Sequence, residues 1–337
     1  MLSRGRLIAD LKAAVDAALT RALPRSSRVA LLGLPRHDNV GDSAIWQAER
    51  RYLRGTGCPL VYLCSARAYS ASRLRRRLGR GVILLSGGGN LGDVWLDEQA
   101  FREQVIQDFP TNPVIQLPQS IFFQDRDRLE NARRVLNSHK QLTLMVRDAR
   151  SLMRAQEYFS AATELCPDVV FTLGTLARGG TPSTEILWLL RSDLESAGSR
   201  PAGRSRTDWN EGLPNLAPDV DDLAQRLAHT LLPYTWIRDR VARMPGSDAL
   251  AERFARARVS RGRRILSQGR VVITDRLHAH ILCLLMGIPH VILDTAQGKL
   301  ADFHATWTSG SPITRFATSD EDAEAKAHVL LRHTSTG

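Results

Sequence analysis

The chain is poor in lysine, in cysteine and in long apolar runs. Four of its 46 basic residues are lysine, so the other 42 are arginine. The four cysteines form no CxxC pair and have no histidines at zinc-site spacing, which argues against a metal centre. No window holds the roughly 18 uninterrupted apolar residues of a membrane-spanning helix. We therefore expect reduced core thiols, no bound metal, no secretory signal and a cytoplasmic protein.

The charge and length of the chain narrow its class further. A formal net charge of +11 over 337 residues favours anionic partners such as phosphorylated metabolites, acidic lipid headgroups or nucleic acid. Arginine suits bidentate recognition of carboxylate and phosphate, but we expect a compositional bias to be the cause of most of the arginine excess. The length is sufficient for two domains of ordinary size.

The first segment, residues 2–23, has apolar residues at 7, 8, 11, 15, 18 and 19, the spacing of one face of an amphipathic helix. The opposite face is basic. We expect this helix to dock on the protein's own core, with contact to a membrane surface as the alternative.

The rest of the chain alternates between strand-like and helix-like segments. Helical patterns at 43–53 and 129–138 are examples of the segments between strands. Such alternation predicts right-handed βαβ units and parallel sheets. We expect an α/β protein with two Rossmann-like domains facing across a cleft, at 1–175 and 184–330. The predicted strands are 28–34, 59–64, 82–86, 113–117, 142–146 and 168–171, then 185–190, 233–237, 270–274 and 290–293. A linker is predicted at 174–183 and a polar surface loop at 196–218.

Ligands of open parallel sheets bind beyond the carboxyl ends of the strands, so polar residues there are candidates for a site. Asn39 and Asp42 follow the first strand, either as a helix cap or as part of a cleft. The third strand leads into "SGGGNLGDVW", residues 86–95. This run satisfies G-x-G-x-x-G but does not open the first βαβ unit, so dinucleotide binding is disfavoured. We expect Gly89 to let a ligand approach the backbone, with Asn90 and Asp93 as polar contacts.

The segment "ITDRLHAH", residues 273–280, carries charge between two apolar runs. Its strand feeds a helix whose N-terminus can bind phosphate, Arg276 can clamp an anion, and His278 can move a proton near neutral pH. His280 and His290 are expected to be structural. Arg147, which ends another strand, is either a ligand of the site or a member of a structural ion pair.

Weaker candidates follow other strands of the second series. These are Arg191, Asp193 and Glu195 after 185–190, and Lys299 and His304 after 290–293. The basic runs at 72–80 and 253–264 are expected to be solvated helix faces that can also attract a membrane-bound, phosphate-bearing substrate.

Five motifs in order, "HDNVGDSAI", "LLSGGGNLGDVW", "VRDARS", "PDVVFTLG" and "VVITDRLHAHILCLLMGIPHVILD", resemble the polysaccharide pyruvyl transferase family. The resemblance runs from about residue 30 to residue 307. It implies an architecture similar to the two-domain, GT-B-like glycosyltransferases. It also implies transfer of pyruvate from phosphoenolpyruvate to two hydroxyls of a sugar as a cyclic ketal, in the biosynthesis of an exopolysaccharide or cell-surface polysaccharide.

Carried onto this chain, the resemblance implies donor binding by Arg147, Arg276, Leu277 and His278, with Gly89, Asn90 and Asp93 nearby. His278, Arg276 and Arg147 are then the catalytic candidates. The candidates for acceptor binding are Asn39, Asp42, Arg191, Glu195 and Lys299. No cofactor or metal is expected beyond phosphoenolpyruvate as co-substrate. The expected acceptor is a lipid-linked oligosaccharide, with weak association of the protein at the inner face of an anionic membrane.

Two other functions compete with this one. A GT-B-like glycosyltransferase using a nucleotide sugar would need an acid to hold the ribose, for which Asp294 or Glu195 is available. A basic nucleic-acid-binding protein would fit the charge, but the chain has no helix-turn-helix, zinc-finger or aromatic RNA-binding motif. We therefore expect no nucleic-acid partner.

Overall fold

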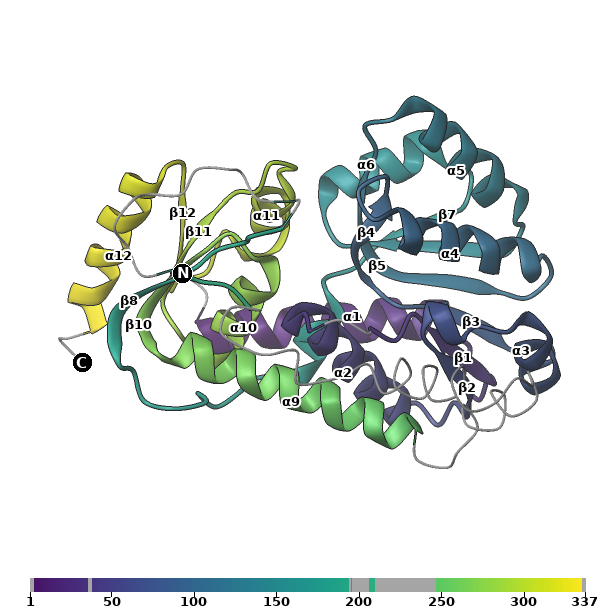
Figure 1. Ribbon diagram of the computed structural model, residues 1–337, viewed down its shortest axis with the longest axis horizontal. Coiled ribbons are helices and arrows are strands. Elements are labelled where there is room, and N and C mark those ends of the chain that lie inside the picture. The colour runs from purple at the N-terminus through teal and green to yellow at the C-terminus, as the bar shows by residue number, and fades with distance from the viewer. Residues whose placement is uncertain (1–2, 36–37, 194, 196–205, 210–246, 335–337) are drawn as a thin grey trace, which may run out of the picture.

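Two parallel β-sheets organise the protein. The structure is a computed structural model that describes residues 3–35, 38–193, 195, 206–209 and 247–334. One sheet has seven strands and the other five, on the right and left of Figure 1. Every described strand pair is parallel, in agreement with the predicted βαβ alternation.

The seven-stranded sheet has the order β2-β1-β3-β5-β6-β7, with β4 paired to β5. Its strands are β1 (Val29–Leu32), β2 (Leu60–Cys64), β3 (Val82–Leu85), β4 (Gly88–Gly92), β5 (Val114–Phe122), β6 (Leu142–Val146) and β7 (Ala162–Leu165). The connecting helices are α2 (Val40–Gly55), α3 (Ala71–Leu78), α4 (Leu96–Asp108), α5 (Arg126–Ser138) and α6 (Ala149–Tyr158), with short 3-10 turns η1 (Ala66–Ala68) and η2 (Val169–Leu173).

The five-stranded sheet has the order β12-β11-β10-β8-β9. Its strands are β8 (Thr184–Leu189), β9 (Arg206–Thr207), β10 (Gly269–Thr274), β11 (His290–Leu293) and β12 (Thr314–Ala317). Around it lie α9 (Ser247–Ser267), α10 (Leu277–Met286), α11 (Lys299–Phe303), a π-helical turn η3 (His304–Thr308) and α12 (Asp320–Thr334).

Each sheet reverses its strand order at one point. The chain leaves β1 for one side of the first sheet and reaches β3 on the other side of β1; it does the same around β8 in the second sheet, with β9 and β10. Such switch points leave a crevice at the carboxyl ends of the strands. The crevices therefore lie after β1 and β3 in one sheet and after β8 and β10 in the other.

Helices pack the two sheets together. α10 is buried along almost its whole length and shares an apolar core with α1 (Arg4–Ala22), α2 and α9. Figure 1 shows α9, in green, running from the five-stranded half toward α2. Gly262 of α9 lies against Val40, so close that an added Cβ would come within 2.4 Å of a Val40 methyl group. This packing places the N-terminus of α2 next to that of α10.

The predicted amphipathic helix docks on the core. All six residues of its apolar stripe are buried in α1, and Arg4 donates two 3.2 Å hydrogen bonds to Leu284 O and Leu285 O at the end of α10. A cation at that position is favourable because the last carbonyls of a helix are unpaired and partially negative. None of the helices in the described ranges combines the length and apolar character that crossing a bilayer requires.

Several local predictions were wrong. The predicted strand at 168–171 is η2, because the Asp168 side chain accepts the Val170 N–H and caps a helical turn. β7 occupies the sheet edge instead, and β12 was not predicted. Gly88–Gly92, expected as a loop, pairs with β5 as β4.

The predicted surface loop and one predicted strand fall largely among residues that are not described. The predicted strand at 233–237 lies outside the described residues. Within 196–218 only residues 206–209 are described, and Asp208 and Trp209 are buried rather than solvated. The four cysteines are buried free thiols, as expected.

Candidate active site

A cavity of about 620 Å³ lies between the carboxyl ends of the two sheets. It is open to both switch points, because residues after β1, β3, β8 and β10 all line it. Of the twelve residues predicted to act in catalysis, donor binding or acceptor binding, eleven line this cavity: Asn39, Asp42, Gly89, Asn90, Arg147, Arg191, Glu195, Arg276, Leu277, His278 and Lys299. The exception is Asp93.

The Asp93 carboxylate binds backbone N–H groups of the protein itself. Its Oδ2 accepts 2.6 Å hydrogen bonds from Gln124 N and Asp125 N, at the end of β5. The structure thus places this carboxylate outside the cavity wall. The prediction rested on sequence proximity to Gly89, but Asp93 lies just after β4, where its carboxylate accepts the backbone N–H groups that follow β5.

The segment from β10 to α10 forms one wall of the cavity. The strand ends at Thr274, whose hydroxyl accepts the Arg276 N–H at 3.1 Å, and α10 begins at Leu277. Asp275 Oδ1 accepts the backbone N–H of Arg191 at 2.8 Å and thereby joins the ends of β10 and β8. Burial raises the pKa of Asp275 to about 6.

Arg276 is held by carboxylates of the protein itself. It is 4% exposed and makes a two-point contact with Asp208, through Nε at 2.5 Å and Nη2 at 2.6 Å. Nη2 also lies 3.3 Å from Asp193 Oδ2. Nη1 has no partner among the described residues, so one edge of the guanidinium remains available to a ligand.

Arg147 is held in a related way on the other sheet. It is 3% exposed; Nε donates to Ser120 Oγ at 2.9 Å and Nη1 to Asp168 Oδ2 at 2.8 Å. Its remaining nitrogen, Nη2, lies against Gly89, where an added Cβ would come within 2.7 Å of it. Glycine at 89 therefore makes room for the guanidinium at the cavity wall.

His278 lies where the two halves meet. Its Nε2 is buried and lies 3.4 Å from Asp168 Oδ2, an ion-pair distance at which the N–H is not aligned on the carboxylate as a hydrogen bond. Burial opposes ionisation of Asp168, but His278 and Arg147 outweigh it and hold the pKa of that carboxyl below its usual range. Asp168 therefore stays an anion between two candidate catalytic side chains.

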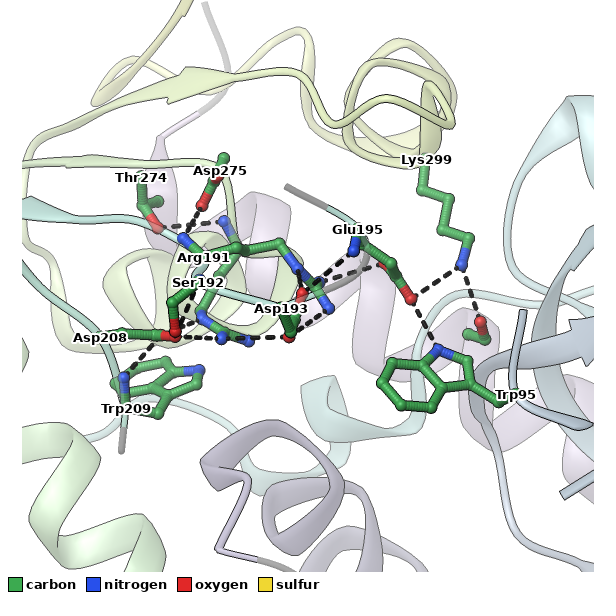
Figure 2. A network of polar contacts seen from close by, with 12 residues as sticks. Trp95, Arg191, Ser192, Asp193, Glu195, Asp208, Trp209, Thr274, Asp275 and Lys299 are labelled. Atoms are coloured by element: carbon green, nitrogen blue, oxygen red, sulfur yellow. Dashed lines mark hydrogen bonds and ion pairs between the residues drawn. The ribbon is translucent and has the colours of Figure 1, made fainter. Parts of the chain in front are cut away.

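A polar network extends from Asp208 to Lys299 (Figure 2). Arg191 pairs with Asp193 at 2.8 Å and with Glu195 at 3.2 Å. Glu195 Oε1 in turn accepts the indole N–H of Trp95 at 2.9 Å and lies 3.2 Å from Lys299 Nζ, which also donates to Gly89 O at 2.8 Å. The network therefore connects the end of β8 to the glycine-rich segment of the other sheet.

The glycine-rich segment contacts two buried ionisable side chains, Arg102 and Glu49. Arg102 Nη2 and Gln119 Nε2 donate to Asn90 Oδ1 at 2.8 and 2.9 Å, so only the amide NH₂ of Asn90 is left for a ligand. Glu49 accepts hydrogen bonds from Ser86 Oγ and from Gly87 N, the latter at 2.8 Å. Burial raises the pKa of Glu49 to about 8 and lowers that of Arg102 to about 10.

The two histidines predicted to be structural are buried behind α10. His280 Nδ1 lies 2.7 Å from His290 Nε2, and His280 Nε2 lies 2.9 Å from Thr308 Oγ1. Burial lowers the pKa of both rings. Both side chains are fully buried and engaged with each other, away from the cavity, as predicted.

Sequence reasoning missed the acids that hold the two arginines. Asp168 was assigned to a strand, although a Pro-Asp pair directly after β7 is a signal for a cap. Asp208 was assigned to a surface loop, and nothing in its local sequence marks it as a partner of Arg276. Trp95 and Trp209, which also line the cavity, were not singled out. Within the described residues no cluster of three or more metal-ligating side chains is found.

The fold of this chain is similar to that of a solved structure. The chain resembles a solved structure of an uncharacterised protein from Klebsiella pneumoniae, with a TM-score of 0.57 and 17% identity, over 92% of this chain and 99% of the other. That likeness supports an α/β protein with two parallel sheets and does not bear on activity.

Sequence relatives then identify the family. Residues 39–297 match the polysaccharide pyruvyl transferase family. Pyruvyl transferase 1 of Schizosaccharomyces pombe is 34% identical over 92% of this chain and 77% of its own length. EpsO of Bacillus subtilis, which carries a provisional pyruvyl transferase name, is 28% identical over 88% and 90%. The chain therefore belongs to the polysaccharide pyruvyl transferase family, and the cavity is the candidate active site of a transferase.

Proposed function

We propose that this protein transfers pyruvate from phosphoenolpyruvate to two hydroxyls of one sugar residue, forming a cyclic ketal and releasing phosphate. The observation that carries the proposal is the convergence of Arg147, Arg276 and His278 from two sheets on one cavity. The proposal adds a donor, a reaction and a set of catalytic residues to the family assignment.

The donor is a small dianion or trianion with a carboxylate and a phosphate on one carbon frame. Arg147 and Arg276 each keep one guanidinium nitrogen without a protein partner in the described part of the chain, and each is held rigidly by a buried carboxylate. The N-termini of α2 and α10 add backbone N–H groups and the positive ends of two helix dipoles. A preorganised site of this kind binds a charged donor without reorganising around it.

The chemistry requires a group that first gives and then accepts a proton. His278 protonates C3 of the enolpyruvyl group, which leaves C2 with oxocarbenium character. A sugar hydroxyl adds to C2 and gives its proton to the neutral His278 ring. Phosphate then leaves with the C–O bonding pair, and the second hydroxyl adds to C2 and gives its proton to the released phosphate, which closes the ketal. Both C–O bonds to the sugar form at C2, and the methyl group keeps the proton delivered by His278.

The acceptor side of the cavity suits a sugar. Trp95 and Trp209 supply apolar ring surface, and Asp42, Asp97 and Glu98 also line the cavity. Aromatic rings beside carboxylates provide both stacking and acceptors for hydroxyl groups. We include Asn39, Arg191, Glu195 and Lys299 in this acceptor region.

The alternative glycosyltransferase reading is weakened by the carboxylates it requires. Asp294 Oδ1 accepts the N–H groups of Thr295 and Ala301, and Glu195 is engaged by Lys299 and Arg191. Burial works against ionisation of Glu195, but those two cations outweigh it and lower its pKa. Neither acid is left to hold a nucleotide ribose. We still propose a GT-B-like arrangement of two domains, 1–175 and 184–330, as a description of the fold and not of the activity.

The test is to incubate the protein with labelled phosphoenolpyruvate and saccharides from its host, including lipid-linked intermediates. The proposal expects phosphate release that depends on the acceptor and a product that gains C₃H₂O₂. In the same assay His278→Gln should lower turnover by about 10²–10⁴-fold while donor affinity changes only a few-fold. Release of a nucleotide from a sugar nucleotide, with no use of phosphoenolpyruvate, would refute the proposal.

We also propose that the protein works in the cytoplasm, on acceptors presented at an anionic membrane. α1 cannot serve as the membrane contact while its apolar face is buried, so the exposed arginines of α3 and its C-terminal turn are the better candidates. Each such charge contributes about 1 kcal/mol near an anionic surface. Sedimentation with anionic vesicles at low and high salt tests this, with Arg76→Gln plus Arg80→Gln as the variant. No binding to anionic vesicles at low salt would contradict it.

A further inference from the structure

His278 is enclosed by two residues of the other half of the protein. The ring belongs to α10, which follows the five-stranded sheet, whereas Asp168 and Gly41 follow strands of the seven-stranded sheet. Asp168 lies on the Nε2 side of the ring and Gly41 on the Nδ1 side. The orientation of this histidine is therefore set across the boundary between the two halves.

Asp168 is built into the protein as a fixed anion. It is 1% exposed, its Oδ1 accepts the Val170 N–H at 3.0 Å, and its Oδ2 accepts from Arg147 Nη1 at 2.8 Å. The same Oδ2 is the oxygen that lies 3.4 Å from His278 Nε2. Because Asp168 does not line the cavity, any effect it has on a substrate passes through His278 or Arg147.

Gly41 holds the opposite edge of the ring. A Cβ at this position would lie 2.4 Å from His278 Nδ1 and 2.7 Å from its Cγ. Gly41 has ordinary helical geometry in the first turn of α2, so the reason for glycine here is space and not backbone conformation. The start of α2 therefore packs against the Cγ–Nδ1 edge of the imidazole, and the His278 side chain lines the cavity.

We propose that Asp168 and Gly41 are positioning residues for His278: Asp168 keeps a proton on Nε2, and Gly41 leaves Nδ1 as the nitrogen that exchanges protons with the substrate. A carboxylate beside one ring nitrogen favours the tautomer protonated there, which leaves the lone pair on the other nitrogen. The identity of the substrate in this proposal rests on the proposed function, whereas the protonation pattern of the His278 ring does not.

The proton balance follows from this arrangement. The imidazolium gives its Nδ1 proton to C3 of phosphoenolpyruvate, whose C2=C3 π pair forms the new C–H bond. The ring is left neutral, with Nε2–H facing Asp168 and a lone pair on Nδ1. That lone pair takes the proton of the sugar hydroxyl as its oxygen bonds to C2, and the imidazolium is restored.

The ring nitrogens can be observed directly in the full-length protein labelled with ¹⁵N-histidine. The His278 signals are assigned as those missing from the His278→Gln spectrum. In the neutral ring we expect a protonated Nε2 and an unprotonated Nδ1. In Asp168→Asn the share of neutral rings protonated at Nδ1 should rise, because the carboxylate that favours a proton on Nε2 is lost. A protonated Nδ1 in the wild type, or an unchanged share of the two tautomers in a folded variant, overturns the proposal.

Turnover gives a second readout of Asp168. Asp168→Asn should lower kcat by about tenfold or more, because the neutral ring no longer presents Nδ1 as its unprotonated nitrogen. Wild-type kcat with weakened donor binding alone would show that Asp168 acts through Arg147 and not through His278, and would overturn its role for the ring.

Gly41→Ala tests the other contact without altering any charge. The methyl group must displace the His278 ring, so kcat should fall by about tenfold or more while KM for phosphoenolpyruvate changes little. Gly55→Ala, in the last turn of the same helix, is the matched control, because a Cβ there meets nothing within 4 Å. Wild-type kcat in Gly41→Ala would overturn the role of this residue. If the wild-type protein does not use phosphoenolpyruvate at all, the proposed function fails, and the NMR experiment still decides how the ring is held.

Discussion

The two arginine sites of the cavity look alike in sequence but differ in how far their charge is neutralised. Arg276 belongs to a connected group of three cations and three carboxylates, whose other members are Arg191, Lys299, Asp193, Glu195 and Asp208. Arg147 shares one carboxylate, Asp168, with His278. The first group is neutral, whereas the second carries one net positive charge whenever His278 is protonated.

This difference assigns unequal roles to two side chains that a motif treats as equivalent. When Nε and Nη2 of a guanidinium both face carboxylates, its electrostatic field is largely cancelled at a distance. Such a group attracts an anionic donor weakly but can still orient it through directed hydrogen bonds. Arg147 retains more of its field when His278 is protonated, and Lys299 Nζ also lies beside Gly89, to whose carbonyl oxygen it donates. We therefore expect Arg147 to provide most of the attraction for the donor and Arg276 to orient it.

The largest expected effect separates the two arginines by donor affinity. Arg147→Ala should weaken phosphoenolpyruvate binding by about 2–4 kcal/mol and Arg276→Ala by about 1–2 kcal/mol, since the latter removes a charge that is already paired. Lysine at either position should rescue only in part, because the planar fork is lost. Calorimetric titration of the donor measures both. Equal losses would break the comparison, and wild-type affinity in both variants would remove the arginines from the donor site.

The next effect concerns the stability of the neutral group. Asp208→Ala leaves Arg276 buried without its main partner and should lower the free energy of unfolding by about 3 kcal/mol. Asp193→Ala serves as the matched control; its side chain is 30% exposed, and its loss should cost about 1 kcal/mol or less. Urea unfolding measures both. If Asp208→Ala is no less stable than Asp193→Ala, Asp208 does not neutralise Arg276 in the way the contacts indicate.

A pH-dependent effect distinguishes the two sides by their buried acids. Glu49, under the glycine-rich segment, has its pKa raised to about 8, and Asp275, beside Arg276, has its pKa raised to about 6, both by burial. A raised folded-state pKa means that the stability contributed by the protonated acid is fully present below the unfolded pKa and is lost as pH rises through the folded value. The loss is at most about 1.4 kcal/mol per pH unit.

The measurement compares each acid with its neutral isostere. Relative to Glu49→Gln, the wild type should lose stability as pH rises from about 4.5 to about 8. Relative to Asp275→Asn, it should lose stability only between about 3.8 and about 6. Urea unfolding at pH 4, 6 and 8.5 gives both differences. A Glu49→Gln difference that stays constant from pH 6 to pH 8.5 would show that this acid does not titrate in that window.

The smallest expected effect probes the space around Arg147. Gly89→Ala pushes a methyl group against Nη2 and should weaken donor binding by about 1 kcal/mol, roughly fivefold. Gly55→Ala, which meets no neighbouring atom within 4 Å, should bind the donor like the wild type. Donor titration of the two alanine variants checks this, and equal affinities would mean that the guanidinium moves aside at no cost.

Much of the fold was predictable because local patterns and buried strands agree. The strand-like runs at 142–146 and 290–293 are β6 and β11 with the same bounds, and the amphipathic stripe of residues 2–23 is the buried face of α1. The failures are short segments in which a side chain redirects the backbone. At 168–171 the apolar residues suggested a strand, but the Asp168 cap made a helical turn.

The site was predictable where residues follow strands and was not predictable where partners come from elsewhere. Arg147, Arg276 and His278 each stand at the carboxyl end of a strand, and parallel strands bring those ends to one edge. Asp208 is 68 residues away from Arg276 in the chain, and no spacing rule connects them. Asp93 shows the converse: it is adjacent to the site in sequence but bonded to the backbone beyond β5.

The sequence by itself determined which residues are the catalytic candidates, because strand, turn and helix signals are local and place Arg147, Arg276 and His278 at strand ends. Only the tertiary structure decided how those groups are charged and oriented. Asp168 and Gly41 reach His278 from the other half of the protein, and Asp208 reaches Arg276 from a distant segment. Electrostatic and packing effects act over a few ångströms in space, whatever the separation along the chain, so the state of each catalytic candidate depends on contacts that only folding creates.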